Sequence, residues 1–296
     1  MDGISTALLL VSISFALLRT LSTKTLSAIR FGTRFYFTVQ TVFFGTGTLL
    51  LAAVALFARA CSSPVTLLFA LGYAAALLSA QWGYTAALSR AGVSISSTVY
   101  SLAFVLPTVA GVLFFSEKTN FLGVIGIAIA CATVVLSGIG KPSGGTDQKS
   151  RAVLPLYALM VAGSGGLGIM QKAWQTFPES GRETPILITL SFAIVTLIAL
   201  MMHCLSRKEP VTATAPSKAS LPAALGGFAF AACNVLNTEL AGRVPGTLLF
   251  PLLNVSSILL TVGVVGIFLR ERLRLREILL IVLAVASILC LSISRI

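Results

Sequence analysis

Long apolar stretches alternate with short polar connections along the whole chain. Hydrophobic residues make up 56% of its 296 positions, and charged residues make up 10%. A helix needs about 17 to 25 apolar residues to cross the hydrocarbon core of a bilayer, and ten stretches approach or reach this length. They cover residues 3–18, 33–57, 65–88, 94–115, 120–140, 152–173, 185–205, 221–239, 246–269 and 275–293. The pattern predicts an all-α integral membrane protein with ten transmembrane helices.

One short polar pattern occurs twice, 154 residues apart, each time between two apolar spans. The copies, which we call the two hinges, are Ser116-Glu117-Lys118 and Arg270-Glu271-Arg272. The same register places Gly92 on Gly246. Repetition of this kind indicates two structural repeats. Each repeat would hold five spans, an odd number, so the second would enter the membrane from the opposite side. We therefore predict an inverted 5+5 arrangement, and we expect the Glu of each hinge to cap a helix or to pair with a cation.

A polar segment divides the chain near its middle. Residues 141–151 contain Pro, Gly, Asp and Gln without hydrophobic periodicity, which is typical of a linker. The first five-helix repeat would then cover residues 1–140 and the second residues 152–296. A second polar stretch, residues 207–220, is predicted to be a loop between the seventh and eighth spans.

The net charge of +12 is spread over short connections instead of being gathered in one basic domain. This distribution argues against nucleic acid as a partner and indicates that the cations orient the protein in the lipid bilayer. One face of the predicted topology carries 15 Lys and Arg residues and the other carries 6. By the positive-inside rule the richer face is cytoplasmic, which places both termini outside.

Several familiar motifs are absent or misleading in this chain. The five cysteines are isolated and include no CxxC pair, so we expect packing residues and neither a disulfide set nor a metal site. Residues 163–168 match the GxGxxG spacing, but they lie inside an apolar span, where close helix packing explains the glycines better. With two aspartates, one histidine and no HExxH motif, the chain is not expected to be an enzyme or to hold a cofactor.

Polar residues inside the spans are the best indication of a binding site, because they are costly in a bilayer. In the 154-residue register Tyr100 aligns with Asn254, and Gln81 lies one position from the equivalent of Asn234. A polar cluster from corresponding helices of two repeats is typical of a transporter site. The predicted substrate-binding residues are Gln81, Trp82, Tyr84, Tyr100, Asn234, Asn237, Asn254 and Ser257. The alternatives are interhelical hydrogen bonding for the polar residues and a core or interfacial position for the aromatic ones.

Four further residues have two interpretations each. Pro107 and Pro251 remove a backbone donor inside the fourth and ninth spans, which predicts a bend that either serves gating or only packing. Glu239 is a candidate proton or cation coupling residue, or it forms an i,i+4 ion pair with Arg243. Lys172 either snorkels to the interface or binds an anion.

Both hinges belong to a wider pattern. Phe115-Ser116-Glu117-Lys118 and Leu269-Arg270-Glu271-Arg272 are each followed by an apolar closing helix, Leu106-Pro107 precedes the first, and Arg30-Phe31 or Arg34-Phe35 opens the second span. In these features the chain resembles the drug/metabolite transporter superfamily, specifically its ten-helix EamA-like permeases. The resemblance implies a 5+5 inverted-repeat fold that moves small metabolites, usually outward. It also implies that both termini are cytoplasmic, whereas the count of Lys and Arg residues places them outside.

The leading hypothesis is a secondary active transporter, a permease or exporter, for a small polar or amphipathic metabolite such as an amino acid or amine. It would work by alternating access around a central cavity between the repeats, in a bacterial inner membrane, as a monomer or homodimer. One alternative is a cation channel or divalent-cation pathway, which would be expected to carry clustered carboxylates. Another is a membrane scaffold that transports nothing.

Overall fold

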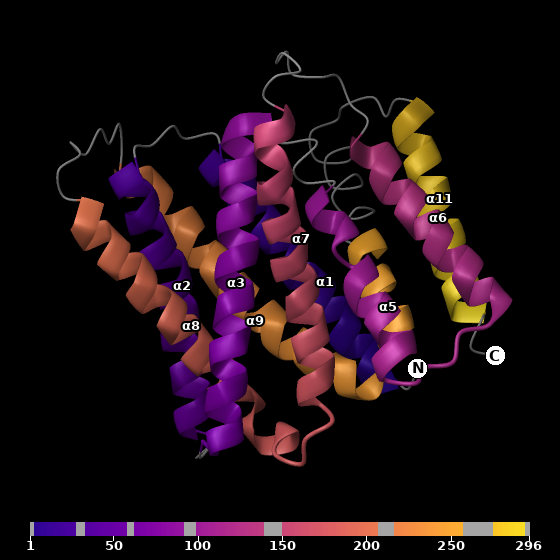
Figure 1. Cartoon of the computed structure of the whole chain (residues 1–296), viewed down its shortest axis with the longest axis horizontal. Helices are drawn as coiled ribbons and strands as arrows, with labels where there is room; N and C mark the ends of the chain where they lie inside the picture. Colours follow the sequence, from indigo (N-terminus) through magenta and orange to yellow (C-terminus); the bar gives the residue numbers. More distant parts are fainter. Residues whose placement is uncertain are drawn as a thin grey trace. The chain divides into compact units, whose positions relative to one another are not determined.

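The computed structural model describes residues 3–27, 33–57, 62–91, 99–138, 150–206, 216–256 and 275–293. Every regular element in these ranges is helical (Figure 1). Within them, six helices are long and apolar enough to cross a membrane: Gly3–Thr23, Arg34–Phe57, Pro64–Ala87, Leu154–Trp174, Ser180–Leu205 and Ala219–Arg243. Shorter apolar helices cover Val99–Phe114, Phe121–Thr133, Gly246–Ser256 and Ile281–Leu291. The prediction of an all-α integral membrane protein is confirmed.

The helix ends agree with the predicted spans in most places. The labelled helices are α1 (Gly3–Ser27), α2 (Thr33–Phe57), α3 (Pro64–Ala91), α5 (Val105–Phe114), α6 (Phe121–Gly138), α7 (Ser150–Trp174), α8 (Ser180–Leu205), α9 (Pro216–Arg243) and α11 (Leu275–Ile293). α1 is longer than predicted, because the hydroxyls of Thr20 and Thr23 bond to carbonyls four residues back and are satisfied within the helix. α9 also starts early, at Pro216, since proline suits a first helical position. The final residues of the predicted loop 207–220 are therefore helical.

The chain forms two compact units, each built from both halves of the sequence. Unit 1 consists of Met1–Ala74 and Trp174–Leu240, and unit 2 consists of Ala75–Ala173 and Ala241–Ile296. The compact units are thus not the two predicted repeats, and α3 and α9 each contribute to both.

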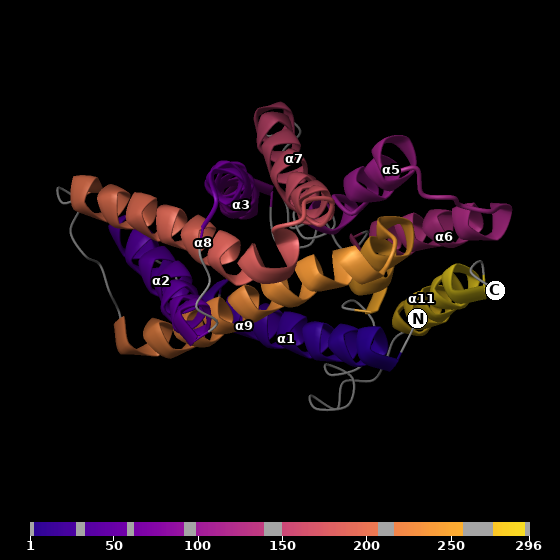
Figure 2. The same cartoon turned by 90° about the horizontal axis from the view of Figure 1, so that it is seen from below.

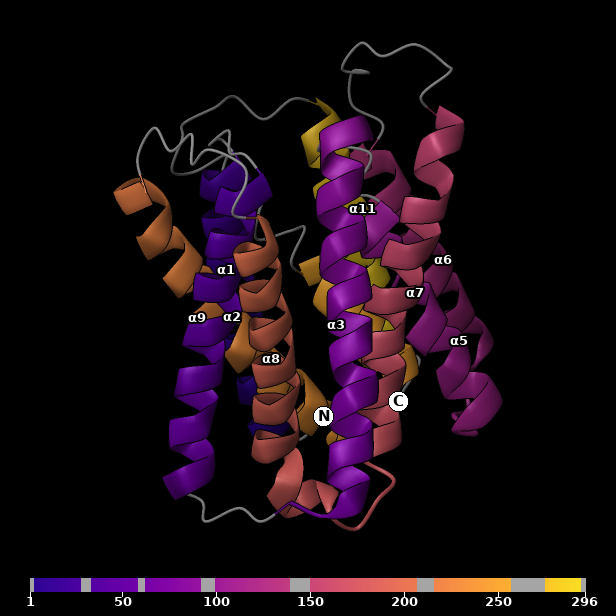
Figure 3. The same ribbon diagram turned by 60° about the vertical axis from the view of Figure 1, so that its left-hand side comes forward.

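In unit 1, α2 packs along α8, as Figures 1 and 3 show. The contact includes an aromatic pair, because the ring centroids of Phe44 and Phe192 lie 5.5 Å apart, and the ring of Phe230 in α9 lies 5.6 Å from that of Phe192. Glycine permits the closest approach of α9 to α2, because a Cβ at Gly227 would collide with the carbonyl oxygen of Phe43. In lipid, such van der Waals packing of small and aromatic residues is a main force that holds helices together.

In unit 2, α6 packs along α11 (Figure 2). Ser287 Oγ of α11 donates a hydrogen bond of 2.9 Å to the Gly126 carbonyl, and a Cβ at Gly126 would lie 2.8 Å from the Leu291 side chain. α7 approaches two neighbours through its glycines. A Cβ at Gly163 would meet the backbone of α3, and one at Gly165 would lie 2.5 Å from Leu106 of α5. The packing interpretation of the GxGxxG match is confirmed.

The helix that contains Tyr100 is interrupted before α5. Residues 99–102 are helical, Ala103 and Phe104 form a turn, and α5 begins at Val105. Pro107 has no N–H for the Ala103 carbonyl, which accepts a bond of 3.2 Å from Leu106 N instead. Pro251, by contrast, lies within the continuous helix Gly246–Ser256.

Candidate functional site

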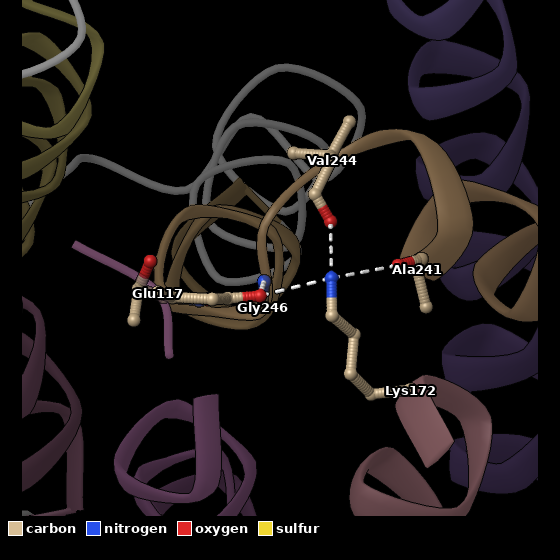
Figure 4. A network of polar contacts seen from close by, with 6 residues as sticks. Glu117, Lys172, Ala241, Val244 and Gly246 are labelled. Carbon is tan, nitrogen blue, oxygen red and sulfur yellow. Dashed lines mark hydrogen bonds and ion pairs between the residues drawn. The ribbon is translucent and has the colours of Figure 1, made fainter. Parts of the chain in front are cut away.

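A buried carboxylate in unit 2 joins several helix ends (Figure 4). Glu117 lies in the turn between α5 and α6, and its side chain is only 7% exposed. Its carboxylate accepts hydrogen bonds from the backbone N–H groups of Gly246 at 2.8 Å and Thr247 at 2.9 Å. These are donors at a helix N-terminus, which have no partner within their helix and attract negative charge. Glu117 therefore caps the helix Gly246–Ser256 from a distant part of the chain.

Lys172, in the last turn of α7, is the cation of the same network. Its ammonium lies 2.9 Å from Glu117 Oε1 and donates to the carbonyl oxygens of Ala241 at 3.0 Å and Val244 at 3.4 Å. These carbonyls are at the C-terminal end of α9, where a cation is favourable. One ion pair thus fixes the end of α9 and the start of the next helix. We refer to Glu117, Lys172 and the backbone groups that they bind as the clamp.

The local backbone is shaped for the clamp. Ser116 has a left-handed φ of 52°, and this turn lets Glu117 N donate to the Gly111 carbonyl at 3.0 Å. Gly111 also provides the space, because a Cβ there would lie 2.7 Å from Glu117 Oε2. Burial alone would raise the pKa of Glu117, but the Lys172 ammonium and the N–H groups of Thr247 and Gly246 outweigh it and lower the pKa. The carboxylate is therefore ionised at neutral pH.

The expectation that the hinge glutamate caps or pairs is confirmed at Glu117, whereas Glu271 lies outside the described residues. The sequence interpretation of Lys172 as snorkelling or anion-binding missed its partner. No local pattern could have revealed it, because the two residues belong to different helix connections far apart in the chain.

The two predicted asparagines of α9 lie in unit 1 and bond to other helices. Asn234 is 4% exposed, and its Oδ1 accepts a bond of 2.7 Å from Tyr73 Oη of α3. Asn237 Oδ1 accepts a bond of 2.6 Å from Ser12 Oγ of α1. Ser12 and Tyr73 were not predicted as site residues. We call these four side chains the polar layer of unit 1.

The polar layer lies well inside the apolar spans. Ser12 is nine residues after Gly3 and eleven before Thr23, the ends of its span. Tyr73 is nine residues after the start of its span, and Asn234 is nine residues before the end of its own. At about 1.5 Å per residue, nine residues correspond to roughly 13 Å along a helix. Ser12, Tyr73 and Asn234 are therefore far from the helix ends, where water would satisfy their polar groups.

The other predicted substrate-binding residues belong to unit 2. The half-buried rings of Tyr84 and Tyr100 are in contact, with centroids 5.1 Å apart. Asn254 Nδ2 donates to the Phe250 carbonyl in its own helix at 2.9 Å. Gln81 is half-buried, whereas Trp82 is 60% exposed. The predicted cluster is thus divided between the two units, and Ser257 lies outside the described residues.

The remaining charged and sulfur groups add one unexpected position. Glu239 is half-buried in α9, and its coupling role stays a prediction. Arg19, which the sequence pattern assigns to a connection, lies within α1 with its Cζ 3.8 Å from the centroid of the Phe230 ring. The described cysteines are free, and the described part of the chain holds no group of three His, Cys, Asp or Glu residues suited to a metal ion.

A small pocket of about 220 Å³ lies beside the clamp in unit 2. It is lined by Lys118, Thr119, Asn120, Gly123, Thr247, Leu248 and Leu291. Asn120 caps α6 through a bond of 2.9 Å from Gly123 N. The pocket therefore lies at a helix connection.

Comparison with known proteins identifies the fold. No family model and no curated protein matches the chain. A solved structure described as "Crystal structure of protein" superimposes with a TM-score of 0.77 at 17% identity, over 99% of this chain and 98% of that one. The chain is thus a multi-helical integral membrane protein whose fold recurs, over its whole length, in a protein of largely different sequence.

Proposed function

We propose that the protein is a secondary active transporter for a small polar or amphipathic metabolite, such as an amino acid or amine. The observation that carries the proposal is the polar layer of unit 1. It brings side chains of α1, α3 and α9, helices from both halves of the sequence, to the interior of their apolar spans. Polar groups at this depth are costly and mark substrate pathways. Transporters of the inverted-repeat class bind their substrates there.

The packing partners of the helices support the two-repeat architecture within this proposal. α2 pairs with α8 and α6 pairs with α11, which are the second with the seventh and the fifth with the tenth predicted spans. The polar layer joins α3 to α9, the third to the eighth. A Cβ at Gly111 of α5 would lie 3.3 Å from the Thr247 side chain, so the fourth predicted span is close to the ninth. These contacts between corresponding spans of the two halves support an interface between the repeats, where inverted-repeat transporters hold their substrate.

The sequence resemblance to EamA-like drug/metabolite transporters completes the proposal. In that scheme the chain has ten transmembrane helices, arranged as two inverted five-helix repeats. One repeat moves against the other and exposes the substrate site alternately on the two sides of the membrane. The interruption at Ala103 and Phe104 fits this scheme, because broken helices recur at transporter binding sites. The Tyr84–Tyr100 contact brings one of the predicted substrate-binding residues of α3 to the edge of that interruption.

Interhelical hydrogen bonding without transport is the competing explanation of the polar layer. Uptake by proteoliposomes separates the two, tested with amino acids, amines, nucleosides and sugars on wild type, Asn237→Ala and Thr48→Val. Thr48 bonds to Thr196 at 3.1 Å between α2 and α8, outside the layer, and is the matched control. Both variants lose one interhelical bond, worth about 0.6 to 2 kcal/mol of stability.

We expect Asn237→Ala to lower uptake per folded protein at least tenfold, while Thr48→Val retains it. Equal uptake by both variants and wild type would show that the layer only holds helices together. Failure of wild type to move any solute in the panel would favour the scaffold alternative.

A further inference from the structure

Asn237 uses its amide differently from the other two asparagines that the structure describes in the predicted cluster. Asn234 and Asn254 each donate Nδ2 to the carbonyl oxygen four residues back in their own helix, at 2.7 and 2.9 Å. The amide of Asn237 turns to another helix instead, where its Oδ1 accepts a bond of 2.6 Å from Ser12 Oγ. Within the described part of the chain, Asn237 Nδ2 has no hydrogen-bond partner.

The Ser12 hydroxyl fixes the orientation of this amide. Its hydrogen needs an acceptor inside the apolar span of α1, and Asn237 Oδ1 is the acceptor that the described residues provide. If the amide were turned around, an N–H donor would face the hydroxyl and the hydroxyl hydrogen would lose its acceptor. The two N–H donors of Nδ2 therefore point away from Ser12.

The Asn237 amide is accessible on a face of α9 that is otherwise covered. At 3.6 residues per turn, Asn237 lies about 160° around α9 from Leu221, which is 65% exposed. The residues one turn away on the same face as Asn237 are each at most 5% exposed, namely Cys233, Asn234, Leu240 and Ala241. Asn237 is nevertheless only half-buried, and its unpaired Nδ2 is not a buried atom.

Helix packing explains only half of this side chain. A serine or threonine would satisfy the Ser12 hydroxyl with one oxygen, whereas asparagine adds two N–H donors. An unpaired amide nitrogen within an apolar span is unfavourable. Asn234 and Asn254 avoid this cost through carbonyls of their own helices, and Asn237 does not. A ligand that places an acceptor oxygen against Nδ2 would remove the cost.

We infer that the Asn237 amide binds an acceptor oxygen of the transported solute and so selects solutes that carry a carboxylate, a carbonyl or a hydroxyl group. The inference rests on the proposed function and narrows it, because simple amines have no such oxygen. Ser12 is a positioning residue, since its hydroxyl holds Oδ1 and leaves Nδ2 for the solute. Asn234, whose amide oxygen and nitrogen both have protein partners, holds helices together.

The test compares each solute that wild type transports with analogues that lack one acceptor oxygen, by uptake into proteoliposomes. An amino acid is compared with its decarboxylated amine and with its primary amide, which keeps a carbonyl oxygen but not the charge. A sugar or nucleoside is compared with its monodeoxy analogues. Uptake is normalised to folded protein by size-exclusion chromatography and by the melting temperature.

The variants separate ligand binding from helix packing. Asn237→Leu and Ser12→Ala lose the same interhelical bond, so a purely structural role predicts equal effects of the two. Asn237→Asp keeps an oxygen for the Ser12 hydroxyl, but an ionised aspartate has no N–H donor for the solute. Thr48→Val, outside the polar layer, is the control for loss of a different interhelical bond.

For wild type we expect at least one analogue without the oxygen to have a KM tenfold or more above that of its parent, and the primary amide to stay close to the amino acid. Both Asn237 variants should bring this KM ratio near one by raising the KM of the parent solute. Ser12→Ala should retain most of the ratio, because the amide is still present, and Thr48→Val should retain all of it.

Three results would overturn the inference and leave the transporter proposal intact: wild type with no preference for the oxygen, an unchanged ratio in both Asn237 variants, or an equal loss of the ratio in Ser12→Ala. If wild type transports no solute, the proposed function itself fails. Asn237→Asp, which is close to asparagine in size, keeps the test decisive if Asn237→Leu does not fold.

Discussion

At the scale of single residues, a few charged side chains inside or beside apolar helices have specific partners. Glu117 binds two helix N–H groups and Lys172, and Lys172 in turn binds two carbonyls. A second glutamate is used similarly in unit 1, where Glu183 of α8 accepts bonds from the backbone and hydroxyl of Ser63 and from Thr66 at the start of α3. Glu117 and Glu183 are therefore both interhelical caps.

Glu117→Gln should destabilise the protein by about 2 to 4 kcal/mol, because it leaves the half-buried ammonium of Lys172 without its counter-charge and weakens two charge-assisted bonds. The measurement is equilibrium unfolding in detergent. Lys118→Gln, which changes the exposed neighbour, should stay within about 0.5 kcal/mol of wild type. Adding Lys172→Met to Glu117→Gln should recover part of the loss, since no unpaired charge then remains. Additive losses in the double variant would contradict this description of the clamp.

The clamp also predicts a pH dependence. The pKa of Glu117 is lower in the folded protein than its ordinary value of 4.5. The unfolded chain therefore binds a proton more readily, so the stabilisation by the carboxylate is complete above that value and is lost as the pH falls through the lower, folded pKa. Unfolding of wild type and Glu117→Gln at pH 7 to 3 should show a constant stability difference above about pH 5 that shrinks in acid. A difference independent of pH would indicate that the charge contributes nothing.

At the scale of helices, glycines decide how closely α7 approaches its neighbours. Gly163 faces the backbone of α3, where a Cβ would lie 2.8 Å from the Ala76 carbonyl oxygen, whereas a Cβ at Gly166 would only reach the Ala76 side chain at 3.8 Å. Two glycines three residues apart on one helix therefore have opposite tolerance for a methyl group.

Gly163→Ala should destabilise the protein by about 1 to 3 kcal/mol, because α7 must move away from α3. Gly166→Ala should be neutral or stabilising by up to about 1 kcal/mol, because alanine favours the helix. Thermal unfolding in the same detergent compares the two. Similar losses in both variants would show that helix propensity or lipid contact, and not the α3–α7 distance, governs these positions.

Sequence alone could predict the helices well, because the requirement for long apolar stretches acts locally. The span 33–57 matches α2, and the span 275–293 matches α11. The sequence pattern did not predict the C-terminal extension of α1 or the early start of α9. Threonine and proline are common in loops, but the threonine hydroxyls bond to carbonyls within α1 and the proline suits the first position of α9. The partners of Glu117 could not be predicted, because Gly246 lies 129 residues along the chain and only tertiary packing brings it near.

At the scale of the molecule, chain halves and compact units are different divisions. Each unit combines helices that precede and follow the linker at residues 141–151, so neither half of the chain forms a compact unit by itself. The candidate site could be predicted only in part. Asn234 and Asn237 are polar residues that local sequence singles out, but Ser12 and Tyr73 gain their significance only through the helices opposite them.

The central claim, a carrier that alternates access, is tested most directly by counterflow in proteoliposomes. Vesicles are loaded with a high concentration of an unlabelled solute that stabilises the purified protein, and labelled solute is added outside at a low concentration. A carrier should accumulate the label transiently above its external concentration, because outward movement of unlabelled solute drives inward exchange through the same site. Equilibration of the label without an overshoot would indicate a channel, and no entry above that of empty vesicles would contradict transport altogether.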